Sequence, residues 1–161
     1  MNIKKPYQLS IQKIETNDIF DWSYSEKDQD LLFLINSTGG DLHTATNLLK
    51  RMLLEKRHIT TKCLGNAQSA GFIIFCGGDE RIANAEDMFL FHSGVWSGNN
   101  TLFSILKYIE ISILSYDMFC HRLAKISNKS YKYWFNILKT EKDYYFSGKE
   151  MKKMGIVTKL L

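Results

Sequence analysis

The sequence predicts an α/β fold with a largely parallel sheet. Three observations predict it: apolar runs alternate with helix-like segments, turn residues follow the predicted strands, and glycines mark several of those turns. The run 31–35 is apolar without alternation, which is typical of a strand covered on both faces. With 161 residues, of which 45% are hydrophobic, the chain is long enough for one domain over residues 1–161 with a substantial core.

The N-terminal third predicts two strands and a helix. Residues 7–14 alternate polar and apolar side chains, as a half-buried strand does. Residues 15–30 are mostly polar and predict a loop. The strand 31–35 then ends in a glycine-containing turn, and apolar residues recur at helical spacing after Asp41, a candidate N-cap.

The middle of the chain predicts three strands around a short apolar helix. A strand over 59–64 leads into a small-residue corner at 65–68 and then into a helix over 69–76, which a glycine pair ends. Apolar runs predict two more short strands over 81–83 and 88–91. Sites in parallel sheets lie at the carboxyl ends of the strands, so we expect the residues that follow these strands to converge.

The C-terminal part predicts three helices, of which the first is the longest. Residues 101–126 carry apolar side chains over much of the helix surface, with Asn100 or Thr101 as the candidate cap. The remaining predicted elements are an aromatic-rich helix, an extended segment, a short helix and a last strand, over residues 130–139, 143–146, 147–154 and 155–157.

Charge and cysteine content exclude several functions. The formal net charge is +4 and no block of like charges is present, so we expect no nucleic-acid partner. No apolar stretch is long enough to span a bilayer, and the basic N-terminus is not followed by the apolar segment of a signal peptide, so we expect no membrane contact. Cys63, Cys76 and Cys120 are odd in number and widely spaced, without a metal-ligand pattern. They predict buried free thiols in a reducing compartment, so we expect a cytoplasmic protein with no metal and no cofactor.

Ser69 is a candidate nucleophile because it stands where the short apolar helix 69–76 is predicted to begin. Backbone N–H groups are free at a helix start, so the N–H of Ala70 is a candidate oxyanion donor. A second donor is predicted at the Gly39-Gly40 corner, where the missing Cβ atoms allow close approach. The alternative is that Ser69 is an N-cap and the glycines form an ordinary turn, which are the more common roles of such residues.

A serine nucleophile needs a base, and a carboxylate that orients the base. His92 is the candidate base because it ends the strongly apolar strand 88–91. The residues leave the carboxylate open among Glu86, Asp87 and Asp143. If the three side chains meet, acyl transfer through a covalent intermediate is the chemistry that they predict.

Four short segments together carry a family pattern. They are INSTGG at 35–40, GNAQSAG at 65–71, FH at 91–92, and DYYFSGKE at 143–150 with MGIV at 154–157. In this order and at nearly this spacing, they resemble the ClpP-type serine peptidases, the proteolytic subunits of the ATP-dependent Clp machine. The resemblance implies the ClpP/crotonase fold, a spiral of ββα units with a largely parallel sheet and a long protruding helix at 101–126.

The resemblance also implies residue roles and partners. Carried over position by position, the catalytic residues are Ser69, His92 and Asp143, and the oxyanion donors are Gly40 and Ala70, with Gly39 adjacent. The implied activity is that of a serine endopeptidase that forms an acyl-enzyme on a peptide or unfolded protein. The implied partners are further copies of the chain in a homo-oligomeric ring and a Clp-type ATPase.

The chain departs from the family pattern at Thr38, Gln68 and Ser93, and the stretches before residue 31 and over 94–100 are short. Action without the ATPase is therefore an alternative. Two other functions stay open: a crotonase-like enzyme acting on an acyl-CoA, and a non-catalytic ring subunit. The first does not need a serine, a histidine and an aspartate together, and the second commonly lacks one of them. Their joint presence favours the peptidase.

Overall fold

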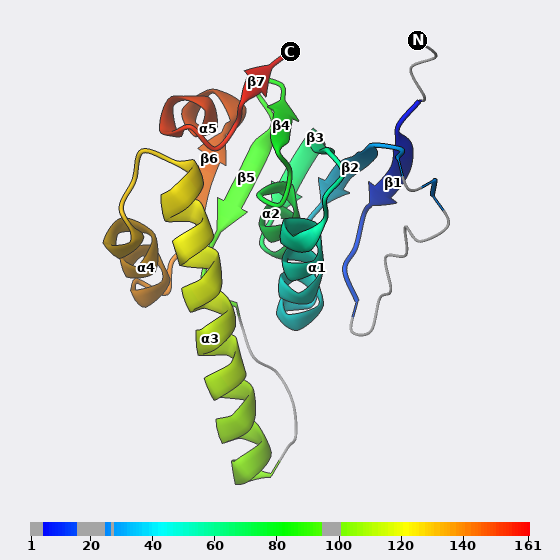
Figure 1. The fold of residues 1–161 in the computed structure, drawn as a ribbon. Coiled ribbons are helices and arrows are strands. Elements are labelled where there is room, and N and C mark those ends of the chain that lie inside the picture. The colour runs from blue at the N-terminus through cyan, green and yellow to red at the C-terminus, as the bar shows by residue number, and fades with distance from the viewer. Residues whose placement is uncertain (1–4, 16–24, 27, 95–100) are drawn as a thin grey trace.

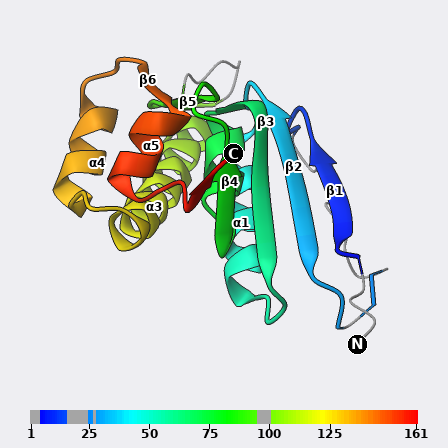
Figure 2. The ribbon, with the colours of Figure 1, turned by 90° about the horizontal axis from the view of Figure 1, so that it is seen from above.

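One mixed sheet organises the molecule, and a computed structural model describes residues 5–15, 25–26, 28–94 and 101–161 of it. The strands are β1 (Tyr7–Ile11), β2 (Leu31–Ser37), β3 (Ile59–Gln68), β4 (Glu80–Ala83), β5 (Met88–Phe91), β6 (Tyr144–Ser147) and β7 (Lys159–Leu160). Within the described residues their order is β1-β2-β3-β4-β7, with β5 also paired to β3 and β6 paired to β5 (Figures 1 and 2). Every pairing is parallel except that of β5 with β6. The predicted α/β class with a largely parallel sheet is confirmed.

β3 is longer than the sequence predicts, and the predicted corner at 65–68 lies inside it. Its first half pairs with β4 through residues 60–62, and its second half pairs with β5 through residues 66–68. Gly65, with φ +101°, lies between the two halves, where the register with β2 also shifts. Glycine and asparagine are poor strand formers, which is why the sequence predicts a corner. The irregularity instead lets one strand change partner and carries the chain directly to Ser69.

The first and last strands also differ from the prediction by three residues or more, whereas β2, β4 and β6 differ by one or two. β1 ends at Ile11, and Ile14 forms an isolated parallel bridge with Gly40. The last strand is β7 and not 155–157, because Gly155 ends the preceding helix with φ +89° and the next two residues are buried in the core. Of the predicted loop 15–30, the described residues form no helix or strand, and the others lie outside the described part of the chain.

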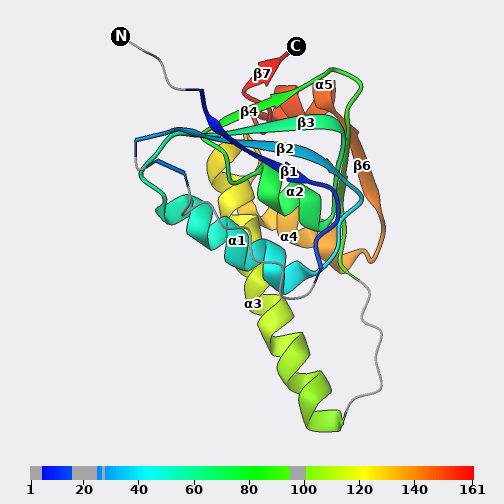
Figure 3. The ribbon, with the colours of Figure 1, turned by 90° about the vertical axis from the view of Figure 1, so that its right-hand side faces the viewer.

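The helices lie mainly on one side of the sheet. They are α1 (Leu42–Leu54), α2 (Ala70–Phe75), α3 (Leu102–Ile126), α4 (Tyr131–Lys139) and α5 (Gly148–Met154). Figure 3 shows α1, α2 and α4 beneath the strands, while α3 projects well beyond the body of the molecule. Among the described residues, none of these helices has the length and apolar character needed to cross a membrane.

Two helix caps agree with the sequence. The Asp41 carboxylate accepts a hydrogen bond from the Thr44 N–H at 2.7 Å, which confirms it as the N-cap of α1. Thr101 caps α3 through the N–H of Ser104, whereas the other candidate, Asn100, lies outside the described residues.

The aromatic core fixes α2 against the sheet and against α3. The ring of Phe72 packs edge-to-face on Phe89, Phe91 and Phe119, with centroid distances of 5.9, 6.2 and 5.6 Å. Pairs in this geometry add about 0.5–1.5 kcal/mol each to the effect of burial. All six residues of α2 are buried. Because α2 starts immediately after Ser69, this packing fixes the position of that serine.

Two arginines, the buried Arg81 and the partly buried Arg122, bind the backbone at the other end of α2. Arg122 donates from Nε to the Cys76 carbonyl at 2.9 Å, and Arg81 donates from Nη1 to the Gly78 carbonyl at 2.7 Å. Burial lowers the pKa of each guanidinium from an ordinary value far above neutrality. The two guanidinium groups therefore hold the C-cap residue and the turn that follows it, so both ends of α2 are fixed.

Candidate active site

The ends of three strands bring the predicted site residues together. β2, β3 and β5 are parallel neighbours, so their carboxyl ends lie at one edge of the sheet. The glycine corner follows β2, Ser69 follows β3 and His92 follows β5. Asp143 immediately precedes β6, which runs antiparallel to β5 and pairs its first residue with the last residue of β5. The carboxylate therefore lies beside the histidine, although the two are 51 positions apart in sequence.

Ser69 has an unusual backbone conformation, with φ 51° and ψ −119°. Its N–H donates to the Leu90 carbonyl at 2.9 Å, and its carbonyl accepts from the N–H groups of Phe72 and Ile73. The hydroxyl makes no capping hydrogen bond to α2. It lies instead 2.9 Å from Nε2 of His92. The N-cap interpretation of this serine is therefore wrong: the residue stands at the cap position but does not cap.

The imidazole of His92 connects Ser69 with Asp143. Its Nδ1 lies 2.9 Å from Oδ1 of Asp143, and its Nε2 lies 2.9 Å from the serine Oγ. An ionised carboxylate only accepts hydrogen bonds, so the Nδ1 side carries the proton and Nε2 is left to accept from the serine hydroxyl. The His92 side chain is 21% exposed and that of Asp143 is 53% exposed. This arrangement can remove a proton from the hydroxyl as it attacks a carbonyl group.

The other two candidate carboxylates do not orient the histidine. Asp87 is buried, and its carboxylate accepts hydrogen bonds from the backbone N–H groups of Gly65 at 3.1 Å and Asn84 at 2.8 Å. It therefore fastens the bulged part of β3 to the turn before β5. Glu86 is exposed on that turn. Of the three carboxylates that the sequence left open, Asp143 is the one that contacts His92.

The glycine corner beside the serine is held by a β-bridge between Gly40 and Ile14 of the N-terminal segment. The Ile14 N–H donates to the Gly39 carbonyl, and the Asp41 N–H donates to the Ile14 carbonyl. In a parallel bridge of this kind, the N–H and carbonyl of the central residue, Gly40, point away from the partner. A Cβ atom on Gly40 would lie 1.7 Å from the Ile14 carbonyl oxygen, so only glycine fits. The bridge therefore does not use the N–H of Gly40, a residue that lines the cleft.

Two further backbone groups flank Ser69. A Cβ on Gly39 would lie 2.8 Å from the Cβ of Ser69, which shows how closely the corner approaches the serine. The Gly39 N–H itself donates to the Ser37 hydroxyl at 3.1 Å. Ala70 is the first residue of α2, so its N–H has no partner within the helix. Gly40 and Ala70 line the same cleft as Ser69, as oxyanion donors must.

The far wall of the cleft comes from α3, which the sequence did not assign to the site. The cleft has a volume of about 1040 Å³. Its α3 wall consists of Tyr108, Ile109, Ser112, Ile113 and Tyr116. These residues recur at i and i+4, so their shared face was readable from the sequence, but which face meets the site depends on how α3 packs.

The three cysteines are buried free thiols, as predicted. Burial raises the pKa of Cys76 and of Cys120 to about 12 each. Burial, followed by the nearby Asp87 charge, raises the pKa of Cys63 even more. None of the three is a thiolate at neutral pH, so none competes with Ser69 as a nucleophile. Among the residues that the structure describes, no group of three histidine, cysteine or acidic side chains is placed to hold a metal ion.

Comparison with known proteins places this geometry in a family. The family model described as Clp protease matches residues 11–161. A curated relative, the ATP-dependent Clp protease proteolytic subunit 2 of Prochlorococcus marinus (strain MIT 9313), is 27% identical over 131 residues, with 79% of this chain and 64% of that protein covered. The chain therefore spans less than two thirds of the length of this relative. Because the family model covers the chain from the end of β1 to the C-terminus, the chain belongs to the Clp protease family.

Proposed function

We propose that this chain is a serine endopeptidase that cleaves peptide bonds through an acyl-enzyme intermediate. The observation that carries the proposal is the imidazole of His92, which lies 2.9 Å from the Ser69 hydroxyl on one side and 2.9 Å from the Asp143 carboxylate on the other. A nucleophile, a base and an orienting acid in this contact order are the minimum for serine-based acyl transfer.

In the acylation step, Oγ of Ser69 bonds to the carbonyl carbon of the scissile peptide while Nε2 of His92 takes the hydroxyl proton. Negative charge develops on the carbonyl oxygen, and the N–H groups of Gly40 and Ala70 are the donors that stabilise it. The carbon–nitrogen bond then breaks as His92 returns the proton to the leaving amine. Asp143 stays ionised throughout and holds the Nδ1 proton, which stabilises the transient imidazolium.

In the deacylation step, water replaces the amine. His92 takes a proton from the water while the water oxygen bonds to the acyl carbon. The N–H groups of Gly40 and Ala70 stabilise the second oxyanion. The ester bond to Ser69 breaks, the proton returns to Oγ, and the peptide acid leaves. The net reaction adds one water across one peptide bond.

The cleft supports a peptide as the substrate. Next to Ser69 and His92 it is lined by apolar side chains of α2, α3 and β5, including Ile73, Ile109 and Phe91. These surfaces suit an aliphatic or aromatic side chain beside the scissile bond. An extended peptide or an unfolded protein segment presents such side chains, whereas a folded surface seldom does.

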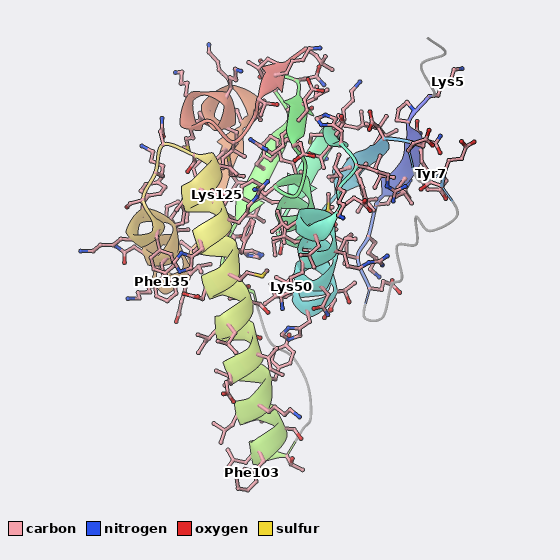
Figure 4. The ribbon with its side chains drawn as sticks, in the orientation of Figure 1. Lys5, Tyr7, Lys50, Phe103, Lys125 and Phe135 are labelled. Atoms are coloured by element: carbon pink, nitrogen blue, oxygen red, sulfur yellow. The ribbon has the colours of Figure 1, made fainter. Side chains whose placement is uncertain are left out.

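The exposed half of α3 supports assembly into a homo-oligomer. Figure 4 shows Phe103 at the far tip of α3, and its side chain is 82% exposed. Other exposed apolar residues of this half, outside the wall of the cleft, are Leu102, Leu106, Ile111 and Leu114. So much apolar surface on one projecting helix is typical of an interface. We propose that the chain acts as a single domain in a ring, with a Clp-type ATPase delivering the substrate.

One comparison tests the catalytic proposal. Ser69→Ala removes the nucleophile, so we expect no labelling by a fluorophosphonate probe and loss of hydrolysis of a fluorogenic peptide amide. Ser10→Ala changes an exposed serine of β1 and serves as the matched control, with both activities unchanged. Labelling of Ser69→Ala equal to that of the unmodified chain would overturn the proposal.

The same assay separates the alternatives. A crotonase-like acyl-CoA enzyme would bind a CoA thioester tightly and leave the fluorophosphonate unreacted. A non-catalytic ring subunit would assemble and react with neither. The hydrogen-bonded set of Ser69, His92 and Asp143 supports the peptidase over both, because neither alternative needs an alcohol activated by a base.

A further inference from the structure

We propose that Tyr116 of α3 is a positioning residue for His92, acting through a hydrogen bond from the Gly94 N–H to the tyrosine hydroxyl. This inference rests on the proposed function, in which His92 is the base. It assigns to α3 a second role besides lining the cleft: the helix contacts the residues on both sides of the histidine, the ring of Phe91 and the backbone of Gly94.

The histidine lies just beyond regular structure. β5 and its ladder with β6 end at Phe91, which pairs with Tyr144. His92 is therefore the first residue outside the strand, and its backbone needs a second anchor on its other side. The Gly94 N–H supplies one, because it donates to the hydroxyl oxygen of Tyr116. His92 sits between these two anchors.

The same helix contacts both neighbours of the histidine. On one side, the ring of Phe119 packs edge-to-face on Phe91 with a centroid distance of 5.7 Å. On the other side, Tyr116 binds Gly94. Tyr116 and Phe119 lie one turn apart on α3, so the two contacts come from one rigid surface.

The position and the hydroxyl of Tyr116 both suit it to hold the Gly94 backbone in place. It lies next to the part of α3 that is anchored in the core, where Phe119, Cys120 and Leu123 are buried. Burial raises the pKa of Tyr116, so its hydroxyl stays protonated and neutral at physiological pH. Its ring lines the cleft, which places the anchor within the catalytic region and not at a distant surface.

The contact is also sterically tight. A Cβ atom added to Gly94 would lie 2.9 Å from the tyrosine hydroxyl oxygen. The close approach that makes the hydrogen bond thus depends on glycine at position 94, and the pair can be tested from both sides.

The first test removes the acceptor. Tyr116→Phe keeps the ring and its packing but cannot accept from Gly94. We expect kcat for a fluorogenic leucine-containing peptide amide to fall between about two- and tenfold, the range that the loss of one hydrogen bond produces. KM, the melting temperature and the solution mass should stay unchanged, because the phenylalanine ring keeps the same packing and the same apolar surface toward the cleft.

The matched control is Tyr131 of α4, which bonds to the same region of α3. The Tyr131 hydroxyl donates to the Asp117 carboxylate of α3 at 2.7 Å, a bond that involves neither His92 nor Gly94. Tyr131→Phe therefore also costs α3 one tyrosine hydrogen bond, and we expect its kcat to match that of the unmodified chain. An equal fall in both variants would mean that the effect is a general loosening of α3, and would overturn the inference.

The second test is a double-mutant cycle. Gly94→Ala should lower kcat in the unmodified chain, because the new methyl group displaces the tyrosine hydroxyl. In the Tyr116→Phe background the hydroxyl is gone, so the same change should cost clearly less. Additive effects of the two changes would overturn the inference, because residues in contact do not act independently.

The outcomes separate this inference from the function on which it rests. If the unmodified chain does not react with fluorophosphonate, the proposed function fails and takes the inference with it. If the unmodified chain reacts and Tyr116→Phe has the same kcat, only the inference fails. A raised KM with unchanged kcat would assign Tyr116 to substrate binding and would equally overturn it.

Discussion

Ser69 is held in a backbone conformation that serine seldom adopts. Conformations of this kind cost roughly 1–3 kcal/mol and persist only where the surroundings fix them. Here the Leu90 carbonyl holds the N–H of the serine, and α2, with its fully buried residues, holds its carbonyl. The result is that Oγ faces the imidazole of His92 and not the free N–H groups of the helix.

At the same scale, Asp143 offers a test of how far an exposed carboxylate can orient a base. Asp143→Asn keeps the size of the side chain but presents an amide that can also donate, so the imidazole tautomer is no longer fixed. We expect kcat to fall by about 10²–10⁴ with little change in KM, as the removal of an orienting acid does elsewhere. Hydrolysis of the fluorogenic peptide amide measures it.

Asp117→Asn is the control for that change, because Asp117 is also partly exposed and accepts a hydrogen bond from a side chain, that of Tyr131. It should leave kcat unchanged. A kcat for Asp143→Asn equal to that of the unmodified chain would contradict the orienting role.

Residue types and element ends were enough to point to Ser69, His92 and the glycine corner, because His92 and the corner follow apolar strands and Ser69 begins an apolar helix. They could not choose among Glu86, Asp87 and Asp143. That choice depends on β5 pairing with β6, a contact between segments far apart in sequence. Nor could they show that Gly40 is bridged to Ile14, since a single bridged residue leaves no periodic pattern.

At the scale of elements, β3 shows where local propensity misleads. Gly65 and Asn66 predict a turn when taken alone, yet both lie inside a ten-residue strand. Two partners stabilise it, β4 along its first half and β5 along its second, and tertiary pairing overrides local preference. Elements with a long regular pattern, such as α1 and α3, were predictable to within about a turn because apolar spacing alone specifies them.

The capping box of α5 gives a pH prediction at this scale. Glu150 accepts hydrogen bonds from the backbone and the hydroxyl of Ser147, and these lower the pKa of its carboxyl group. A lowered folded-state pKa means that the stabilisation is present above the ordinary glutamate pKa of about 4.3 and is lost as the pH falls through the lower, folded value.

Glu150→Gln keeps an acceptor at this position without a titrating group. We expect the unmodified chain to melt above the variant at neutral pH, with the difference shrinking below about pH 4. Melting temperatures of the two proteins across this range measure it. A difference that stays constant down to acid pH would contradict a role for the ionised carboxylate.

At the scale of the whole molecule, α3 belongs to two regions at once. Its C-terminal part is buried against Phe72 and Phe91, while its N-terminal half projects from the body with apolar side chains exposed. A protein that kept this half in water would carry an unusually large apolar patch. The assembly proposed above removes it.

A charge on the projecting half tests the assembly. We expect Leu106→Asp to lower the solution mass toward that of a single chain, because an unpaired carboxylate at an apolar interface is strongly unfavourable. Lys125→Asp, an exposed change near the other end of α3, is the control and should leave the mass unchanged (Figure 4). Sedimentation or light scattering measures both, and an unchanged mass for Leu106→Asp would contradict the assignment.

The bridge between Ile14 and Gly40 has a consequence for the N-terminal segment. The backbone of Ile14 holds the turn that contains Gly40, one of the two oxyanion donors that we propose. Removing the chain up to and including Ile14 would leave the hydrogen bonds among Ser69, His92 and Asp143 in place but would remove the bridge that holds Gly40. We expect such a truncated protein to react with a fluorophosphonate at the same rate and to hydrolyse peptides more slowly. The N-terminal segment would then affect the rate of peptide hydrolysis and not the reactivity of Ser69.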